Sequence, residues 1–370
     1  MNIPFLSFHG MHDPLKADIT KAFRKVYDSH WYIMGNELKQ FEANYAAYSK
    51  TKYSIGVANG LDALIISLKS LNIGEGDEVI VPSNTYIASW LAVSYVGARP
   101  VPVEPVETTF NIDPDLIEAA ITPKTKAIMP VHLYGQCCEM DRIMAIAKKH
   151  KLFVVEDNAQ SQGSRCNNKL SGSFGDINAT SFYPGKNLGA LGDAGAITTN
   201  SEDLCQKAMV IRNYGSQKKY YNEVKGINSR LDELQAAILD VKLKHLNHWN
   251  AERLEIAGKY NQLLSGIGDV QLPMVSANCT HVYHLYVIRT AKRDALQEFL
   301  NKSSIGTLIH YPVPPHLQEA YKELKYKKNS FPLAEKMAET CLSLPLYPGL
   351  KNEQIEFVAR KVKEFFSSKA

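Results

Sequence analysis

The feature that most constrains the fold is a regular alternation of short apolar runs and amphipathic stretches between about residues 55 and 200. The β-rich runs DEVIVPS, ARPVPV, KAIMPVHLYG, LFVVED, NATSFYP and GAITTN lie at 77–83, 98–103, 126–135, 152–157, 178–184 and 195–200. Helical stretches lie between several of them, at 61–73, 86–97 and 140–151. Apolar strands separated by helices are typical of a mainly parallel sheet covered on both faces. The sequence therefore predicts an α/β fold with its ligand site at the carboxyl ends of the strands.

A smaller unit is predicted after this region. Apolar residues follow a helical period in NSRLDELQAAILDVKLKHLNHWNAERLEIAGKYNQLL (228–264), and Ser229 with Asp232 forms a capping-box start for one long helix. Further on, HVYHLYVIR (281–289) reads as a strand, followed by a Pro-rich turn and two terminal amphipathic helices. We predict a large domain over 1–250 and a smaller α+β domain over 251–370.

The composition excludes several classes of protein. Of the 370 residues, 45% are hydrophobic and 22% charged, as in ordinary globular proteins. The formal charge of +4 suits an anionic small substrate but is too weak and dispersed for a nucleic-acid surface. No apolar stretch is long enough to span a bilayer, and the N-terminus lacks the features of a signal peptide. The six cysteines follow no metal-binding or disulfide spacing, so we expect reduced thiols in a cytoplasmic protein.

One lysine lies in the glycine-rich stretch SFYPGKNLGALGDAGAITTN, residues 181–200. Taken alone, Lys186 could clamp a phosphate, act as a Schiff-base nucleophile or carry an ordinary surface charge. Ser181, five positions earlier, could add a hydroxyl to a phosphate site. Motifs elsewhere in the chain distinguish between these three roles.

Three such motifs follow predicted strands. Asp157 closes the run LFVVED, where it is either an active-site acid or a cap for the next turn. Gly60, in VANGLDALIISL, begins a helix whose free amides could bind a phosphate, or it belongs to an ordinary turn. Tyr86, in PSNTYIAS, could stack on a flat ring or pack in the core. Together with Lys186, this set suits pyridoxal 5'-phosphate (PLP), with the lysine as Schiff base and the acid on the pyridine nitrogen.

The stretches EDNAQSQG, SFYPGKNLGALGDAGAITTN and GINSRLDELQAAIL resemble the signatures of the DegT/DnrJ/EryC1/StrS aminotransferases. The resemblance runs from WYIMGNELKQFE to SLPLYPGL, nearly the whole chain. It implies a fold-type-I PLP-dependent transferase that acts on nucleotide-linked keto sugars. Some relatives replace the lysine with histidine and perform dehydration instead. Because this chain keeps Lys186, the resemblance implies transamination.

The resemblance also implies roles for individual residues. Lys186 matches the Schiff-base lysine, which also moves the proton during the reaction. Asp157 matches the ionised partner of the pyridine nitrogen. Gln160 matches the residue beside the cofactor ring and its phenolic oxygen, and Tyr86 matches the stacking aromatic.

The phosphate cradle is matched by Gly60, Leu61 and Ser181, the first two through their backbone N–H groups. Asn228 matches an asparagine that reaches the phosphate from the partner subunit, which implies a homodimer with composite sites. The other interpretation of Asn228, a residue that merely precedes a helix cap, stays open.

Two segments are candidates for the substrate side. The loop SQKKYYNEVKG could hold a diphosphate and a base or sugar, or it could be a solvated basic loop. The segment LIHYPVPPHL could line the sugar site or form a simple turn. The candidate residues are Lys218, Lys219, Tyr220, Tyr221, His310 and Tyr311. His281 and His284 have HxxH spacing, but on a strand they would face opposite sides, so we expect no metal site there.

Within the family, the helix start at 228–250 with HLYVIR and GTLIHYPVPPHLQ resembles the branch that aminates carbon 3 of dTDP-linked 3-keto-6-deoxy sugars. The implied product is a dTDP-3-amino-3,6-dideoxyhexose, with L-glutamate as amino donor. Three alternatives stay open: a carbon-4 enzyme of the same family, another fold-type-I PLP enzyme such as a carbon–sulfur lyase, and a non-catalytic PLP-binding sensor.

Overall fold

A computed structural model describes residues 1–367 and contains one large sheet that organises the chain. Its strands are β1 (Tyr53–Val57), β2 (Glu78–Pro82), β3 (Arg99–Val103), β4 (Thr125–Ile128), β5 (Phe153–Asp157), β8 (Ile177–Ser181) and β9 (Gly195–Thr199), in the spatial order β1-β9-β8-β5-β4-β2-β3. The two pairs that involve β9 are antiparallel and the other pairs are parallel. The predicted α/β class with a mainly parallel sheet is therefore confirmed.

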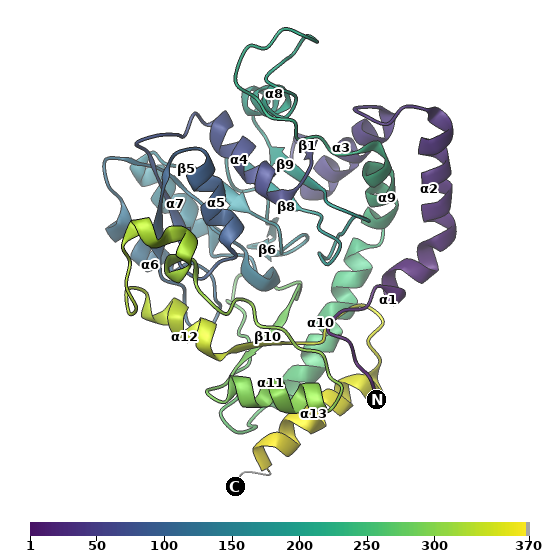
Figure 1. The fold of residues 1–370 in the computed structure, drawn as a ribbon, viewed down its shortest axis with the longest axis vertical. Helices are drawn as coiled ribbons and strands as arrows, with labels where there is room; N and C mark the ends of the chain where they lie inside the picture. Colours follow the sequence, from purple (N-terminus) through teal and green to yellow (C-terminus); the bar gives the residue numbers. More distant parts are fainter. Residues whose placement is uncertain (368–370) are drawn as a thin grey trace.

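Helices cover both faces of this sheet (Figure 1). One face packs against α4 (Gly60–Ser70), α5 (Ile87–Tyr95) and α8 (Glu202–Ile211). The other face packs against α3 (Asn36–Ser49), α6 (Pro114–Ile117), α7 (Met140–His150) and α9 (Glu233–Leu243). Side chains alternate along β2 between the two faces of the sheet. Val79 and Val81 enter the core beneath α4 and α5, and Ile80 enters the core beneath α7. Burial on both faces explains why the strands read as continuous apolar runs.

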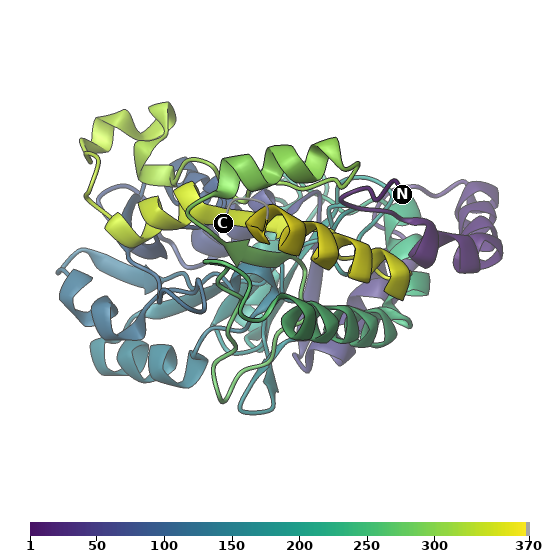
Figure 2. The same ribbon diagram turned by 90° about the horizontal axis from the view of Figure 1, so that it is seen from below.

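A second hydrophobic core lies around a two-stranded antiparallel sheet, β10 (Tyr286–Arg289) and β11 (Cys341–Leu344). The helices α10 (Leu246–Leu264), α11 (Arg293–Lys302) and α13 (Asn352–Ser367) pack around it, and Figure 2 shows α11 and α13 near one another. Ile3, from the other end of the chain, is buried in the same core. The predicted domain boundary at residue 250 falls inside α10, and the two-domain division stays a prediction.

The remaining elements are short or peripheral. They are α1 (His9–His12), α2 (Lys16–Ser29), α12 (Pro332–Thr340), the small hairpin β6 (Arg165–Cys166) and β7 (Lys169–Leu170), and the 3₁₀ turns η1 (Asp13–Leu15), η2 (Glu118–Ala120), η3 (Leu133–Gly135), η4 (Pro315–Leu317) and η5 (Glu319–Leu324). Helix α2 packs against α9 at the edge of the molecule (Figure 1). No helix among residues 1–367 has both the length and the apolar character needed to cross a membrane.

The predicted capping box is wrong, and so is the single long helix. The first helix starts at Glu233 after Asp232, and it ends at Leu243, before α10. The Ser229 hydroxyl instead accepts a hydrogen bond of 3.1 Å from the amide of Ala58, just before the Gly60 turn. The box fails because Ser229 contacts a distant loop rather than its own helix.

Two predicted strands are shorter than their apolar runs. The run 126–135 is a regular strand only as far as Ile128. Isolated bonds to Ile80 and Asp157 continue along it before the turn η3. The run 281–289 is a strand only from Tyr286, because the preceding residues pair with residues 134–136 instead, as in the 2.9 Å bond from the Val282 amide to the Gly135 carbonyl. The start of β10 thus reflects a contact between these two segments.

Candidate active site

The sheet brings the predicted motifs to a single edge. Asp157 and Ser181 are the last residues of the parallel neighbours β5 and β8. Gly60 and Tyr86 stand where β1 and β2 give way to the helices α4 and α5. Since β1, β2, β5 and β8 all run in the same direction, these residues meet at the carboxyl edge, where ligands bind in such sheets.

Asp157 is a buried carboxylate that is held at both oxygens. Its Oδ2 accepts a hydrogen bond of 2.8 Å from the Ser89 hydroxyl, and its Oδ1 accepts one of 3.1 Å from the Ala159 amide. Burial raises the pKa of Asp157, while these two donors and the charge of Lys186 oppose the rise. Ser89, on α5, had no signal in the sequence, because only the packing of α5 brings it to the end of β5.

Lys186 lies on a tight loop between β8 and β9. Its amide donates to the Tyr183 carbonyl at 2.8 Å, and the Ala190 amide donates to Phe182 at 2.8 Å. Gly189 has to be glycine here, because a Cβ would lie 2.2 Å from the Pro184 carbonyl oxygen. Glycine therefore lets the loop close upon itself and present the lysine.

The Lys186 side chain is half-buried, and its ammonium has no hydrogen-bond or ion-pair partner within residues 1–367. Burial lowers its pKa to about 8, while Asp157 acts in the opposite direction. His284 and His310 also lie within electrostatic reach, and the Lys186 charge helps to lower their pKa values after the larger effect of burial. The site thus disfavours the charged forms of the Lys186 amine and of both imidazoles.

Gly60 and Ser181 form a narrow cradle at the start of α4. A Cβ on Gly60 would lie 2.7 Å from the Cβ of Ser181, so only glycine keeps this space open. Asn59 caps the helix by accepting the Asp62 amide at 2.8 Å, and Leu61 follows in the first turn. Free amides at the start of an eleven-residue helix, together with a hydroxyl, suit a phosphate group.

Gln160 connects the strand ends to the Tyr311 segment. Its Oε1 accepts the Tyr134 amide at 2.6 Å, and its Nε2 donates to the Tyr311 hydroxyl at 3.1 Å. The rings of Tyr86 and Tyr311 are 5.1 Å apart and tilted by 36°, and the Tyr86 side chain is half-exposed. The interpretation of Tyr86 as a core residue is therefore wrong, since its ring borders the site.

His310 is fixed from two sides. Its Nδ1 is hydrogen-bonded to the Ser343 hydroxyl at 2.8 Å, and its carbonyl accepts the Tyr134 hydroxyl. The structure thus brings the predicted pair His310 and Tyr311 to the same edge as Lys186. Ser343 and Tyr134 are the partners that sequence patterns did not reveal.

The histidine pair at 281 and 284 does not lie on a strand. The His281 ring accepts the Tyr283 amide at 2.8 Å, whereas the buried Nδ1 of His284 has no partner within residues 1–367. Arg253 holds the backbone here by donating to the carbonyls of Tyr283 and His284. The HxxH spacing singles out His284 in the sequence, but only the fold places its ring near Lys186.

The structure does not bring four predicted residues to this edge. Figure 1 shows the loop after α8 projecting from the body of the molecule, and the hydrogen bonds of residues 216–224 stay within 213–226. The residues concerned are Lys218, Lys219, Tyr220 and Tyr221. Asn228 is exposed and precedes Ser229, which bonds to Ala58 beside the Gly60 turn. Tyr220 and Tyr221 are 85% and 63% exposed, with Lys219 and Lys218 over their respective rings. A single chain thus leaves these four loop residues away from its own Lys186.

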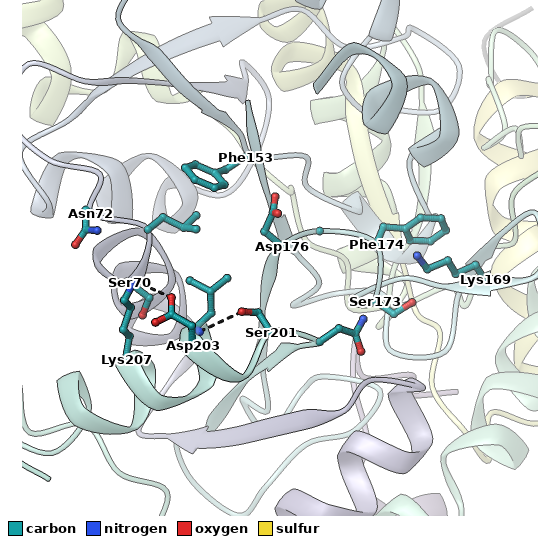
Figure 3. Close-up of a pocket in the computed structure, with 14 residues that line it drawn as sticks. Ser70, Asn72, Phe153, Lys169, Ser173, Phe174, Asp176, Ser201, Asp203 and Lys207 are labelled. Atoms are coloured by element: carbon teal, nitrogen blue, oxygen red, sulfur yellow. Dashed lines mark hydrogen bonds and ion pairs between the residues drawn. The ribbon is translucent and has the colours of Figure 1, made fainter. Parts of the chain in front are cut away.

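A surface pocket, drawn in Figure 3, lies elsewhere. It is lined by Phe153, at the amino end of β5, and by the start of α8. Its charged residues Asp203 and Lys207 pair with each other at 2.8 Å. Asp157 lies at the opposite end of β5, so this pocket is separate from the candidate site.

The strand-end residues fit PLP in three respects. The cradle at Gly60 is open for a phosphate, Lys186 carries an amine without a partner, and Asp157 is a buried acceptor facing that amine's charge. The half-exposed ring of Tyr86 offers an aromatic surface. These are the groups that an aldehyde, a phosphate and a pyridine ring require.

Comparisons with known proteins agree with this chemistry. A model of the DegT/DnrJ/EryC1/StrS aminotransferase family matches residues 13–363. The dTDP-3-amino-3,6-dideoxy-alpha-D-galactopyranose transaminase of Aneurinibacillus thermoaerophilus is 52% identical over 363 residues, 98% of this chain and 99% of that protein. The erythromycin biosynthesis sensory transduction protein EryC1 of Saccharopolyspora erythraea is 48% identical, covering 98% and 99%.

Solved structures show the same fold. DesV from S. venezuelae, in complex with a ketimine intermediate, has a TM-score of 0.97 and 47% identity, covering 98% of each chain. NtdA from Bacillus subtilis, with bound cofactor PMP, the amino form of PLP, has a TM-score of 0.92 and 34% identity, covering 99% of this chain and 85% of that one. The chain therefore belongs to the DegT/DnrJ/EryC1/StrS aminotransferase family, whose members depend on pyridoxal phosphate.

Proposed function

We propose that this aminotransferase converts a dTDP-3-keto-6-deoxyhexose to the dTDP-3-amino-3,6-dideoxyhexose, with L-glutamate as the amino donor. The observation that carries the proposal is the unpartnered Lys186 amine beside the buried carboxylate of Asp157. The choice of sugar is supported by the 52% identical relative, which is named for a dTDP-3-amino-3,6-dideoxy sugar. We also infer a cytoplasmic location, supported by six buried cysteines that are all free thiols.

In this proposal, Lys186 holds the cofactor and Asp157 faces its ring nitrogen. Bound PLP supplies an aldehyde that receives the amino group and a ring that withdraws electrons from the reacting carbon. The free Lys186 amine would transfer the proton through Nζ. A pKa of about 8 lets this amine both accept and return a proton near neutral pH. Ser89 and the Ala159 amide orient the Asp157 carboxylate.

The other site residues bind and shield. Gly60, Leu61 and Ser181 would hold the phosphate through backbone amides and a hydroxyl. Tyr86 would lie against the cofactor ring, and Gln160 would border its phenolic oxygen. On the sugar side, His310 and Tyr311 would contact the substrate, since Ser343 and Gln160 fix their orientation.

We propose a homodimer with composite sites, because four of the predicted residues lie on a loop that projects away from the body of their own chain, and Asn228 is exposed. A partner subunit would bring Asn228 to the phosphate and the loop 216–226 to the diphosphate of the nucleotide. Exposed aromatic side chains on and after α2 support such an interface, since monomers rarely leave so many uncovered. They are Phe23, Tyr27, Trp31 and Tyr32.

The first experiment records the absorbance spectrum of the purified protein before and after L-glutamate. We expect a visible band from lysine-bound cofactor that glutamate bleaches and that a dTDP-3-keto-6-deoxy sugar restores. Lys186→Ala should lack this band. Restoration by a 4-keto sugar alone would favour the carbon-4 alternative. Failure of glutamate to bleach a normal band would favour the non-catalytic sensor.

The composite site is tested by mixing two inactive variants, Lys186→Ala and Asn228→Ala, after dissociation and reassociation. In a composite dimer, each mixed pair has one site with both defects and one intact site, so about a quarter of the sites regain activity. If Asn228 served its own chain's Lys186, mixing would restore nothing. Each variant reassociated with itself is the control.

A further inference from the structure

Lys242 is a buried lysine of α9 that the chemistry above does not use. It is 1% exposed, and no carboxylate within residues 1–367 pairs with it. Its ammonium donates to the Gly189 carbonyl and lies 3.0 Å from Nε2 of His12. An ammonium has no acceptor, so the His12 ring is the acceptor in this contact. Lys242 therefore joins the Lys186 loop to the N-terminal helix α1.

The contact falls at the point where the Lys186 loop closes. Gly189 is packed against Pro184, with room for no side chain, and the next residue, Ala190, bonds back to Phe182. A donor at the Gly189 carbonyl thus acts on the whole turn that carries Lys186. The same helix α9 holds the far end of the loop, because Gln235 accepts the Leu191 amide at 2.8 Å.

On its other side, Lys242 reaches a firmly packed segment. The His12 ring stacks on Phe8, with ring centroids 5.1 Å apart. A Cβ on Gly10 of α1 would lie 2.2 Å from the Pro348 carbonyl, so α1 packs closely against the segment that follows β11. Through Lys242 and His12, the Lys186 loop is therefore connected to Phe8 and to the segment around Pro348.

A buried ammonium without a counter-ion is costly, and an apolar side chain of similar length would pack there more cheaply. Its benefit must lie in the two polar contacts. Lys242 does not act on Lys186 by charge, because burial and Asp157 are the influences on the Lys186 pKa. Any effect on Lys186 passes through the backbone at Gly189.

We propose that Lys242 is a positioning residue, which fixes the Lys186 loop between α9 and α1 so that the lysine amine meets its substrate in one orientation. The proposal deepens the function proposed above and rests on the role of Lys186. Because Lys242 would hold the loop itself, its loss should also change the hydrogen exchange of that loop, which can be measured without catalysis.

The test compares Lys242→Met with Lys244→Met, an exposed lysine of the same helix end, in hydrogen exchange of the cofactor-bound protein followed by mass spectrometry. We expect exchange at the Lys186 and Ala190 amides to rise about tenfold or more in Lys242→Met, since a charge-assisted hydrogen bond is lost. Exchange in β5 should not change. In the glutamate half-reaction, kcat should fall by a similar factor while KM stays the same.

A second variant approaches the contact from the other side. His12→Phe keeps the stacking on Phe8 but removes the acceptor, and it should raise exchange in the same loop by a smaller factor. If Lys242→Met fails to fold, His12→Phe decides the matter. Unchanged loop exchange in the variant that folds would overturn the proposal, whatever its activity. Wild-type protein without transamination would instead refute the proposed function and leave the exchange result valid.

Discussion

Ser89 donates a hydrogen bond of 2.8 Å to Oδ2 of Asp157, although the two residues are 68 positions apart. The hydroxyl comes from α5 and the carboxylate from the end of β5. Burial raises the pKa of Asp157, and this bond is the largest of the influences that oppose it. A serine with no catalytic signature thus helps to keep the site's acid ionised.

Ser89→Ala should therefore raise the Asp157 pKa further, since a donor to the charged form is removed. We expect a loss of about tenfold in the glutamate half-reaction, greatest on the acidic side of the pH profile. Single-turnover rates between pH 5.5 and 9 measure this. Ser94→Ala, on the same helix and bonded to Tyr321, is the control. A profile parallel to that of the wild type would contradict the assignment.

Lys186→Met should stabilise the cofactor-free protein at pH 7. The folded pKa of Lys186 is about 8, below its ordinary 10.5, so between these values the unfolded chain binds more protons and stability rises with pH. Below this window the folded wild type carries an unfavourable ammonium, which Met removes. Melting temperatures should be higher for the variant at pH 7, and the gap should narrow as the pH rises from about 8. A gap independent of pH would show that packing, not charge, is responsible.

Gly60→Ala should weaken cofactor retention and lower stability. The new Cβ would lie 2.7 Å from the Cβ of Ser181. Overpacking of this kind typically lowers the free energy of unfolding by about 1–3 kcal/mol. Urea unfolding and cofactor release during dialysis measure the two effects. Adding Ser181→Gly removes the clash, so the double variant should lose the stability defect but not regain full cofactor affinity. If the double variant were as unstable as Gly60→Ala, the clash would not be the cause.

Tyr311→Phe should affect the sugar half-reaction more than cofactor binding. It removes the 3.1 Å bond to Gln160 but keeps the ring beside Tyr86. We expect a higher KM for the keto sugar, by about tenfold, with an unchanged cofactor spectrum. Tyr86→Phe, whose hydroxyl makes no hydrogen bond to residues 1–367, is the matched comparison and should change little. Loss of cofactor from Tyr311→Phe would place this tyrosine in the cofactor site instead.

The α/β class and the position of the site were accessible from the sequence because both depend on local patterns. A strand buried on both faces needs a continuous apolar run, and such strands joined by helices must run parallel. Asp157 could be placed at a strand end for the same reason, whereas Ser181 lies inside the predicted run 178–184 and ends its strand only in the structure. The errors lie where a side chain or backbone bonds to a distant segment: Ser229 with Ala58 rather than with its helix, and Val282 with Gly135 rather than with a strand.

The sequence by itself thus determined the sheet, the Lys186 loop and the identity of the groups at the strand ends. The tertiary structure alone decided what surrounds them: Ser89 at Asp157, Tyr311 at Gln160, and Lys242 at Gly189. The physical reason is one of range. Periodicity and turn chemistry act over a few residues, whereas these contacts join segments 68, 151 and 53 positions apart and exist only once helices have packed against the sheet.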